Sequence, residues 1–480
     1  MKRYIQIIAV VLVCMFLPMD VYAQSIPYDT YNYDYRENAV PTPAAYVPVD
    51  TIYGKDLECG SFNGPKDMFI AEDGTIYVAD SGNNRIVVMN QEYEILEVID
   101  SFLNNLQEDT FLKPSGICVT DENLLYIADT DHGRVVVLDQ NRELVKIISD
   151  PKSDVLSADF IFSPLKVSVD YAGRVYVVAA NIYQGIMAFD QDSQFMGYFG
   201  TINVQITLYE RFWRLFSTKE QRSKQQQFIP TEFTNVDIDS EGFVYATNID
   251  TTGEQAVRML NPKGQDVIVN PISGTSVLGG DVKYRENGQY QGVSEIVDVK
   301  VRDGGIYSLL DRKRGRVFSF DSEGNCLYIF GGLGTQEGTF SYPAAIESYG
   351  DKIYILDSSR STVAVFEATQ YGKYINEAVG LRYDGDEAAA VELWEKVLEL
   401  DSNNEMAYSG IGKAYLSAGD NETAMYYLKM GMNREFYSIA FKRYRNDILK
   451  ENLGWILTGV IVVSVGYPIA KAVIKRKKRG

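Results

Sequence analysis

The chain has 480 residues, of which 46% are apolar and 23% are charged, and its formal net charge is −19. This apolar content is enough for a folded core and excludes a wholly disordered chain. The negative charge disfavours direct binding to nucleic acid. A single histidine, His132, excludes any metal site within the chain that needs two or more imidazoles.

The N-terminus has the pattern of a cleavable secretory signal. Lys2 and Arg3 precede an apolar run, and Val21 and Ala23 give the small-residue spacing of a cleavage site. We therefore predict that residues 1–23 are removed on export. Residues 24–45, which are rich in tyrosine and proline, are predicted to form an extended tether.

The C-terminus has the pattern of a single membrane span followed by a basic tail. Residues 453–474 contain one charged side chain, Lys471, and are long enough to cross a bilayer. Residues 475–480 are mostly lysine and arginine, which favours a cytoplasmic location. The two ends together predict a single-pass protein of the cell membrane, with its N-terminal domain extracytoplasmic and its C-terminus cytoplasmic.

A sixfold repeat occupies residues 46–367. Each unit has a strand, a turn, a strand centred on a tyrosine, a second turn and a third strand. The central tyrosines are separated by 49, 50, 69, 62 and 47 residues, and the two long intervals imply insertions. A period near 50 is typical of propeller blades. The tyrosines are Tyr77, Tyr126, Tyr176, Tyr245, Tyr307 and Tyr354. We therefore predict a mainly β protein built around a six-bladed β-propeller.

Five of the six units are followed by a fourth strand. These strands are predicted at Ile95–Ile99, Leu144–Ile148, Phe195–Phe199, Asp266–Val269 and Leu327–Phe330. The sixth unit lacks one, because the pattern turns helical after Glu367. An unpaired edge there would favour aggregation. We therefore expect Tyr46–Tyr53 to pair with Val363–Phe366 and so to close the ring.

The units resemble NHL repeats, which combine a Pro-Gly entry, a Gly turn, a Tyr-Val-Ala-Asp strand and an Asn-x-Arg-Val strand. Asp80 with Arg85 fits this pattern best, followed by two further pairs, Asp129 with Arg134 and Asp311 with Arg316. We interpret these pairs as ion pairs that fix turns between strands. The resemblance implies a module for protein interaction.

Residues 371–450 change to a helical pattern. Small and large residues align at an interval of about 34, as in Trp394 with Leu428, so the segment resembles tetratricopeptide repeats. Two such units cannot bury their apolar faces alone. We therefore expect this segment to dock on the propeller or on a capping helix, and to act as a stalk above the membrane.

A helical insertion is predicted at residues 203–228, within the propeller. It combines apolar and basic side chains that would suit the docking of a partner, namely Arg211, Phe212, Trp213, Arg214 and Phe216. The alternative is a helix that packs across one face of the propeller.

The first strand of each unit lines the axis of a propeller. Alignment of the units brings four polar residues to this axis, Asp67, Lys166, Asn235 and Asp298. They are candidate ligand-binding residues, and the oxygens of Asp67, Asn235 and Asp298 would suit Ca²⁺ if a metal binds at all. The alternative is a polar network, satisfied internally around trapped water. No other cofactor is predicted.

Three functions are compatible with this organisation. The favoured one is a membrane-anchored extracytoplasmic binding or scaffold protein without enzymatic activity, which presents its propeller and helices to protein or envelope partners. The second is an accessory or ligand-sensing subunit of a membrane transport complex. The third is a metal-dependent, lactonase-like propeller hydrolase.

Overall fold

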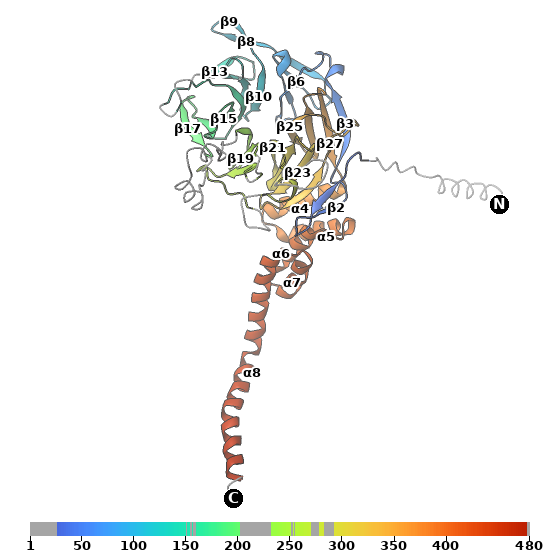
Figure 1. Cartoon of the computed structure of the whole chain (residues 1–480), viewed down its shortest axis with the longest axis vertical. Coiled ribbons are helices and arrows are strands. Elements are labelled where there is room, and N and C mark those ends of the chain that lie inside the picture. The colour runs from blue at the N-terminus through green and yellow to red at the C-terminus, as the bar shows by residue number, and fades with distance from the viewer. Residues whose placement is uncertain are drawn as a thin grey trace, which may run out of the picture.

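The computed structural model describes residues 26–149, 151–153, 156, 160–201, 232–250, 253, 255–269, 278–282 and 292–477. Six sheets form a ring, and a helical segment follows that ends in one long projecting helix (Figure 1). The predicted leader, residues 1–23, and the predicted helical insertion, residues 203–228, lie outside the described residues.

The first three blades are four-stranded antiparallel sheets in simple sequence order. Blade one contains β4 (Asp67–Ile70), β5 (Ile76–Asp80), β6 (Arg85–Met89) and β7 (Ile95–Ile99). Blade two contains β10 (Pro114–Val119), β11 (Leu125–Asp129), β12 (Arg134–Leu138) and β13 (Leu144–Ser149). Blade three contains β14 (Pro164–Val169), β15 (Val175–Ala179), β16 (Ile186–Phe189) and β17 (Phe195–Phe199). A hairpin of β8 (Ser101–Asn104) and β9 (Gln107–Thr110) joins blades one and two.

The last three blades each depart from this scheme. Blade four contains β18 (Phe233–Ile238), β19 (Val244–Asn248) and β20 (Val257–Leu260). Blade five contains β21 (Ile296–Arg302), β22 (Ile306–Asp311), β23 (Arg316–Asp321) and β24 (Cys326–Phe330) and gains two N-terminal strands. Blade six contains β25 (Pro343–Tyr349), β26 (Lys352–Asp357), β27 (Thr362–Ala368) and β3 (Tyr46–Tyr53). Short 3₁₀ turns lie at Gly54–Asp56, Ser81–Asn83, Gly280–Val282 and Asp303–Gly305.

The predicted closure of the ring is confirmed. Strand β3 pairs antiparallel with β27, and Ile52 lies opposite Val363. The first propeller strand in the sequence therefore completes the last blade, and the free edge of β27 is removed.

The predicted fourth strand of blade four is wrong in extent. Only an isolated bridge joins Leu260 to Asp266, although the Val267 N–H also donates to the Met259 carbonyl over 2.8 Å. The Asp266 carboxylate accepts hydrogen bonds from the Met259 and Ile268 N–H groups. The Asp266 side chain thus occupies one N–H group of β20 and one of the predicted fourth strand. Beyond the bridge the two segments do not form a regular ladder.

The predicted Asp–Arg pairs fix turns in blades one and two. The Arg85 Nε donates to Asp80 over 2.8 Å, and Arg134 binds Asp129 over the same distance. In blade five the prediction is corrected, because Asp311 binds Arg314 over 3.2 Å. The Arg316 guanidinium instead donates to backbone carbonyls of Asp29 and Gly331.

The predicted tether is also corrected, because residues after Ser25 fold onto blade five. Strand β1 (Tyr31–Tyr33) pairs with β2 (Ala39–Pro41) and with β24, so that blade five has six strands. The Tyr31 hydroxyl donates to the buried Asp281 carboxylate over 2.5 Å. Tyrosine supplies both the apolar area and the hydrogen bond that hold this hairpin, which we call the N-terminal hairpin.

Four helices follow the propeller in antiparallel succession, and polar caps mark their starts. They are α4 (Gln370–Tyr383), α5 (Glu387–Leu400), α6 (Glu405–Ala418) and α7 (Asn421–Met430). The side chains of Thr369, Asp386, Asn404 and Asp420 cap them. Small residues permit close packing, since a Cβ on Gly410 would meet Trp394 and one on Gly412 would meet Leu428. The tetratricopeptide assignment of this segment stays a prediction.

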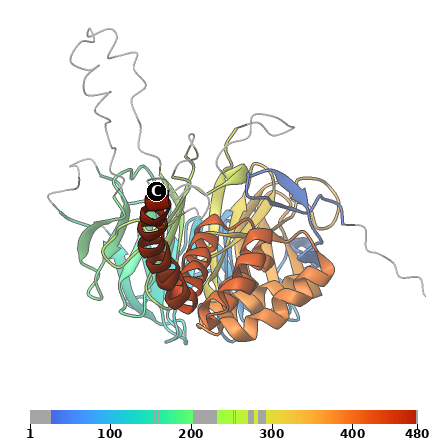
Figure 2. The ribbon, with the colours of Figure 1, turned by 90° about the horizontal axis from the view of Figure 1, so that it is seen from below.

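The helical segment shares one continuous core with blades five and six. Tyr371, Ile375 and Trp394 lie in the same buried cluster as Phe330 and Phe366. Seen from below, α4–α7 lie against one side of the propeller (Figure 2). This docking buries the apolar helix faces that two helical repeats could not bury alone.

A polar network reinforces the junction between propeller and helices. The Arg302 guanidinium donates to the hydroxyls of Tyr46 and Tyr328 over 2.6 and 2.8 Å. Asn376 of α4 links the same two tyrosines, because it accepts from the Tyr328 hydroxyl and donates to the Tyr46 hydroxyl. Strand β3, the first propeller strand in the sequence, is thus linked to α4, the first helix after the propeller.

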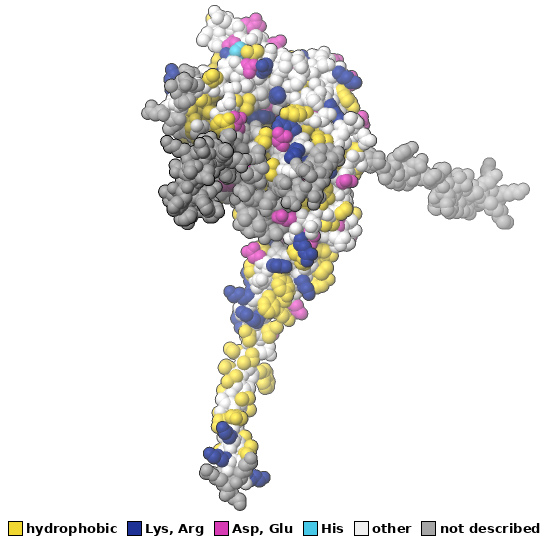
Figure 3. Space-filling view, viewed as in Figure 1, with side chains coloured by type: hydrophobic (Ala, Val, Ile, Leu, Met, Phe, Trp, Pro, Cys, Tyr) yellow, Lys and Arg dark blue, Asp and Glu magenta, His cyan; other side chains and the backbone are white. Residues whose placement is uncertain are grey.

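Helix α8 (Arg434–Lys477) is the last element and the longest. Its first turns pack on α7, and the Asn421 amide donates to Asp447 over 2.9 Å. Beyond this contact the helix is exposed and covered with apolar side chains (Figure 3). Among the described helices, α8 is the one that is long and apolar enough to be a candidate membrane span.

Candidate functional site

The predicted axial residues lie on the inner strands β4, β14, β18 and β21. Strands β14, β18 and β21 are consecutive around the ring, whereas β10 lies between β4 and β14, and β25 lies between β21 and β4. All four are buried, and Asp298 is only 2% exposed. The Lys166 ammonium forms an ion pair with Asp67. The structure therefore brings Asp67 and Lys166 together, and Asp298 lies close enough for Lys166 to influence its titration.

The backbone satisfies the remaining oxygens of this axial layer. Asp67 accepts a second hydrogen bond, from the Ile117 N–H, over 2.8 Å. Asp298 accepts from the N–H groups of Ile346 and Val299 over 2.7 and 2.8 Å. Burial raises the pKa of Asp298 to about 7, against the opposing effect of Lys166.

A second axial layer lies two residues further along the inner strands, and its residues were not among the predicted site residues. The Lys300 ammonium lies 2.9 Å from the Glu347 carboxylate and 3.9 Å from that of Asp237. Burial raises the pKa of Glu347 to about 8, although Lys300 lowers it. Because alternate strand residues face the same side, counting two positions on from Asp298 would have found Lys300.

The proposed calcium ligands fit a cation poorly in this geometry. Each side-chain oxygen of Asp67 and Asp298 already accepts a hydrogen bond, as does the Asn235 Oδ1, from Val236 over 2.7 Å. Calcium requires several oxygen ligands free to face the ion. Across the described ranges, no group of three or more His, Cys, Asp or Glu side chains is placed to hold a metal.

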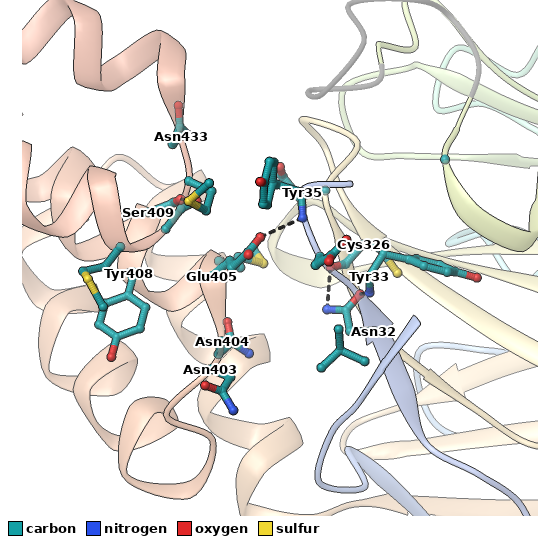
Figure 4. A pocket seen from close by; sticks show the side chains of 18 of the residues that line it. Asn32, Tyr33, Tyr35, Cys326, Asn403, Asn404, Glu405, Tyr408, Ser409 and Asn433 are labelled. Atoms are coloured by element: carbon teal, nitrogen blue, oxygen red, sulfur yellow. Dashed lines mark hydrogen bonds between the residues drawn. The ribbon is translucent and has the colours of Figure 1, made fainter. Parts of the chain in front are cut away.

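A second candidate site lies between the propeller and the helices. A groove of about 900 Å³ is lined by the N-terminal hairpin, the outer part of blade five, the start of α6 and the loop between α7 and α8. Figure 4 shows Asn403, Glu405 and Tyr408 on one wall, with Asn32 and Tyr35 opposite. We call this feature the groove.

The groove walls are held at fixed separation. The Tyr35 N–H of the hairpin donates to the Glu405 carboxylate of α6 over 2.9 Å (Figure 4). The Asn32 amide donates to the carbonyls of Cys326 and Leu327, both over 3.1 Å. The N-terminal hairpin therefore links blade five to the helical segment through hydrogen bonds.

A cluster of charges beneath the groove joins blade five to the helices. Glu323 binds Arg382 of α4 and lies 2.8 Å from the Lys413 ammonium of α6. Arg382 also lies 3.8 Å from Asp321. The ion pairs with Lys413 and Arg382 lower the pKa of Glu323 to about 2, outweighing the effect of its burial. The two cations are thus neutralised by the propeller.

None of the groove residues was predicted as a site. The predicted partner-docking residues, Arg211, Phe212, Trp213, Arg214 and Phe216, lie outside the described residues. The groove joins segments that are far apart in the chain, such as Tyr35 and Glu405. A sequence signal existed only for the individual elements, in the tyrosine-rich N-terminus and the helical periodicity.

The family comparison agrees with this architecture. Residues 62–89 and 111–138, in blades one and two, match the NHL repeat. The protein is a six-bladed propeller with NHL repeats. No curated protein sequence matches the chain.

Solved structures similar to this NHL-repeat propeller include two bacterial proteins. Selenomethionine-substituted virginiamycin B lyase from Staphylococcus aureus is 7% identical, with a TM-score of 0.42, over 67% of this chain and 99% of that one. A protein of unknown function from Bacteroides thetaiotaomicron is 14% identical, with a TM-score of 0.45, over 69% of this chain and 80% of that one.

Proposed function

We propose that this protein is a membrane-anchored, extracytoplasmic binding or scaffold protein, and that a protein partner docks in its groove. The groove carries the proposal, because it is a concave surface with both polar and apolar side chains, assembled from the hairpin, blade five and the helical segment. The match to NHL repeats also supports partner binding, because such repeats commonly form modules for protein interaction.

The contrast with the axis supports binding over catalysis. Asp67 and Asp298 have their oxygens engaged by Lys166 and by backbone N–H groups. A metal ion at Asp67 would require the Lys166 ammonium to be displaced. The alternative of a metal-dependent hydrolase has a direct test, since bound calcium and lactone hydrolysis that is lost in Asn235→Ala would support it.

Helix α8 supports the membrane anchor. Its exposed apolar stretch follows directly on the turns that pack on α7, so the propeller would be held at a fixed position above the bilayer. The basic side chains at its end favour a cytoplasmic C-terminus. A partner within the membrane, such as a transport component, would then lie within reach of the groove.

Site-specific photocrosslinking from the full chain in its native membrane tests the proposal. A crosslinking amino acid at Asn403, on the groove wall, should capture a discrete protein partner. The same amino acid at Glu122, which is exposed on the turn between β10 and β11, serves as the control. Equal capture from both positions, or none from Asn403, would contradict partner binding in the groove.

A further inference from the structure

The groove carries an excess of negative charge. Its lining includes five carboxylates, those of Asp34, Glu37, Asp401, Glu405 and Glu435. Three cations also line it, but Arg382 and Lys413 bind Glu323 beneath the groove. Among the lining cations, Arg434 remains to oppose the five carboxylates, and Arg36, which does not line the groove, lies near Asp34. A ligand with positive charge would therefore be favoured.

Glu405 is the carboxylate that accepts a hydrogen bond across the groove, from the Tyr35 N–H of the opposite wall. It is half-buried, and burial raises its pKa, against the lowering effect of the Tyr35 N–H. One of its oxygens accepts from that N–H, while the other has no hydrogen bond to any described residue. A partly desolvated carboxylate with an open oxygen is a suitable partner for an ammonium or guanidinium group.

Amide groups on the walls also have open hydrogen-bonding positions. Within the described part of the chain, the exposed Asn403 side chain has no hydrogen-bond partner. Asn433 accepts from the Phe436 N–H through its Oδ1, and its amide nitrogen donates to no described residue. Asparagine side chains present a donor and an acceptor together, which matches the alternating N–H and C=O groups of an extended peptide.

The groove also contains adaptable apolar surface. Met406, Met430 and Met432 line it, and Met430 is 45% exposed. Methionine side chains are flexible and polarizable, so they can accommodate side chains of different shapes. Tyr35 and Tyr408 add rigid aromatic surface on the opposing walls (Figure 4).

We propose that the groove binds an extended peptide segment of a partner protein and selects a lysine or arginine side chain through Glu405 and Glu37. This inference rests on the proposed binding function and specifies its ligand. The amides would bind the peptide backbone, the carboxylates would bind the basic side chain, and the methionines would cover neighbouring apolar residues.

A random dodecapeptide library displayed on phage, applied to the full chain in phosphatidylcholine nanodiscs, tests the ligand class. The expected result is enrichment of peptides with an excess of lysine and arginine. Enriched peptides would then be synthesised, and fluorescence anisotropy would give their affinities. In the double variant Glu37→Gln/Glu405→Gln we expect affinity to fall about fivefold, which is the upper range for a partly exposed ion pair.

Glutamine at position 405 can still accept the Tyr35 N–H, so the walls should keep their separation. The control is Glu72→Gln/Glu122→Gln, which removes the same charge from exposed turns of blades one and two and should leave affinity unchanged. Thermal unfolding of both variants checks that they fold.

The outcomes separate this inference from the proposed function. Enrichment of neutral or acidic peptides, or equal affinity of basic peptides for the double variant and the parent, would overturn the basic-peptide ligand and leave partner binding in place. A library without enriched peptides would also overturn it. Loss of specific photocrosslinking at Asn403 would instead contradict the proposed function itself.

Discussion

The axis of the propeller and the groove beside it are both rich in charge, yet they differ in how that charge is compensated. On the axis, Lys166 binds Asp67 and backbone N–H groups engage the other oxygens. In the groove, Glu405 keeps an open oxygen, and the Asn403 side chain has no hydrogen-bond partner among the described residues. Internal compensation indicates a structural role, whereas open groups on a concave surface indicate binding.

Among the proposed substitutions, removal of the axial Lys166 should cause the largest loss of stability. Lys166→Met would leave Asp67 and Asp298 buried without their cation, at a cost of about 3–5 kcal/mol in the free energy of unfolding. Chemical denaturation would measure it, with Lys66→Met on an exposed position as the control. A loss no larger than that of the control would show that the axial charges are not coupled, and the comparison with the groove would fail.

Two glycines of α4 test whether the helical segment is docked rigidly enough to form a groove wall. A Cβ on Gly372 would lie 2.2 Å from the Ala45 carbonyl oxygen, so Gly372→Ala should destabilise by about 1–3 kcal/mol. A Cβ on Gly380 would meet only the Gly304 Cα at 3.7 Å. Gly380→Ala should therefore stabilise by about 0.5–1 kcal/mol, because alanine favours helices.

The same substitution is thus expected to have opposite signs at two positions of one helix. Thermal unfolding of both variants would measure this difference. Stabilisation by both alanines would mean that α4 moves freely against Ala45, and the groove would then lack a fixed wall.

The shifted pKa values of the axial carboxylates predict that stability depends on pH. This effect should be smaller than that of removing Lys166. Burial raises the folded-state pKa of Asp298 to about 7, so the folded protein binds this proton more tightly than the unfolded chain does. Its stabilising effect is complete below the unfolded pKa and is lost as the pH rises through about 7. Between pH 6 and pH 8, Asp298 alone should reduce stability by about 1 kcal/mol.

Denaturation at a series of pH values would measure this slope, and Asp298→Asn should flatten it. Glu347, whose pKa burial raises to about 8, should supply the slope that remains. A slope that is identical in the parent and in Asp298→Asn would mean that this carboxylate stays ionised, with Lys166 as its effective partner.

The sequence pattern was sufficient for features that depend on local repetition. The six tyrosine-centred units predicted the blades, and the missing fourth strand after Phe366 predicted the closure by β3. Alignment of the units also predicted that Asp67 and Lys166 lie on the axis, where they form an ion pair. Such features recur at a fixed period, so one unit gives information about the next.

Features that depend on contacts between unrelated segments could not be predicted in this way. The N-terminal hairpin was expected to be a tether, because its composition does not reveal that Tyr31 finds Asp281. The partner of Asp311 was assigned by analogy, and a local bond to Arg314 replaced it. The groove needs both the hairpin and α6 in place, and no periodic pattern connects Tyr35 with Glu405.

The position of α8 has a consequence for access to the ring. In Figure 1 the strands β10, β21 and β25 lie near the centre of the propeller, while β3, β13 and β17 lie at its rim, and α8 leaves beyond that rim. If α8 anchors the protein as proposed, the axis of the propeller would run parallel to the plane of the bilayer. Both ends of the propeller axis would then face sideways into the same compartment, and the groove, on the side of the propeller closest to the bilayer, would be the part nearest to neighbours in the membrane.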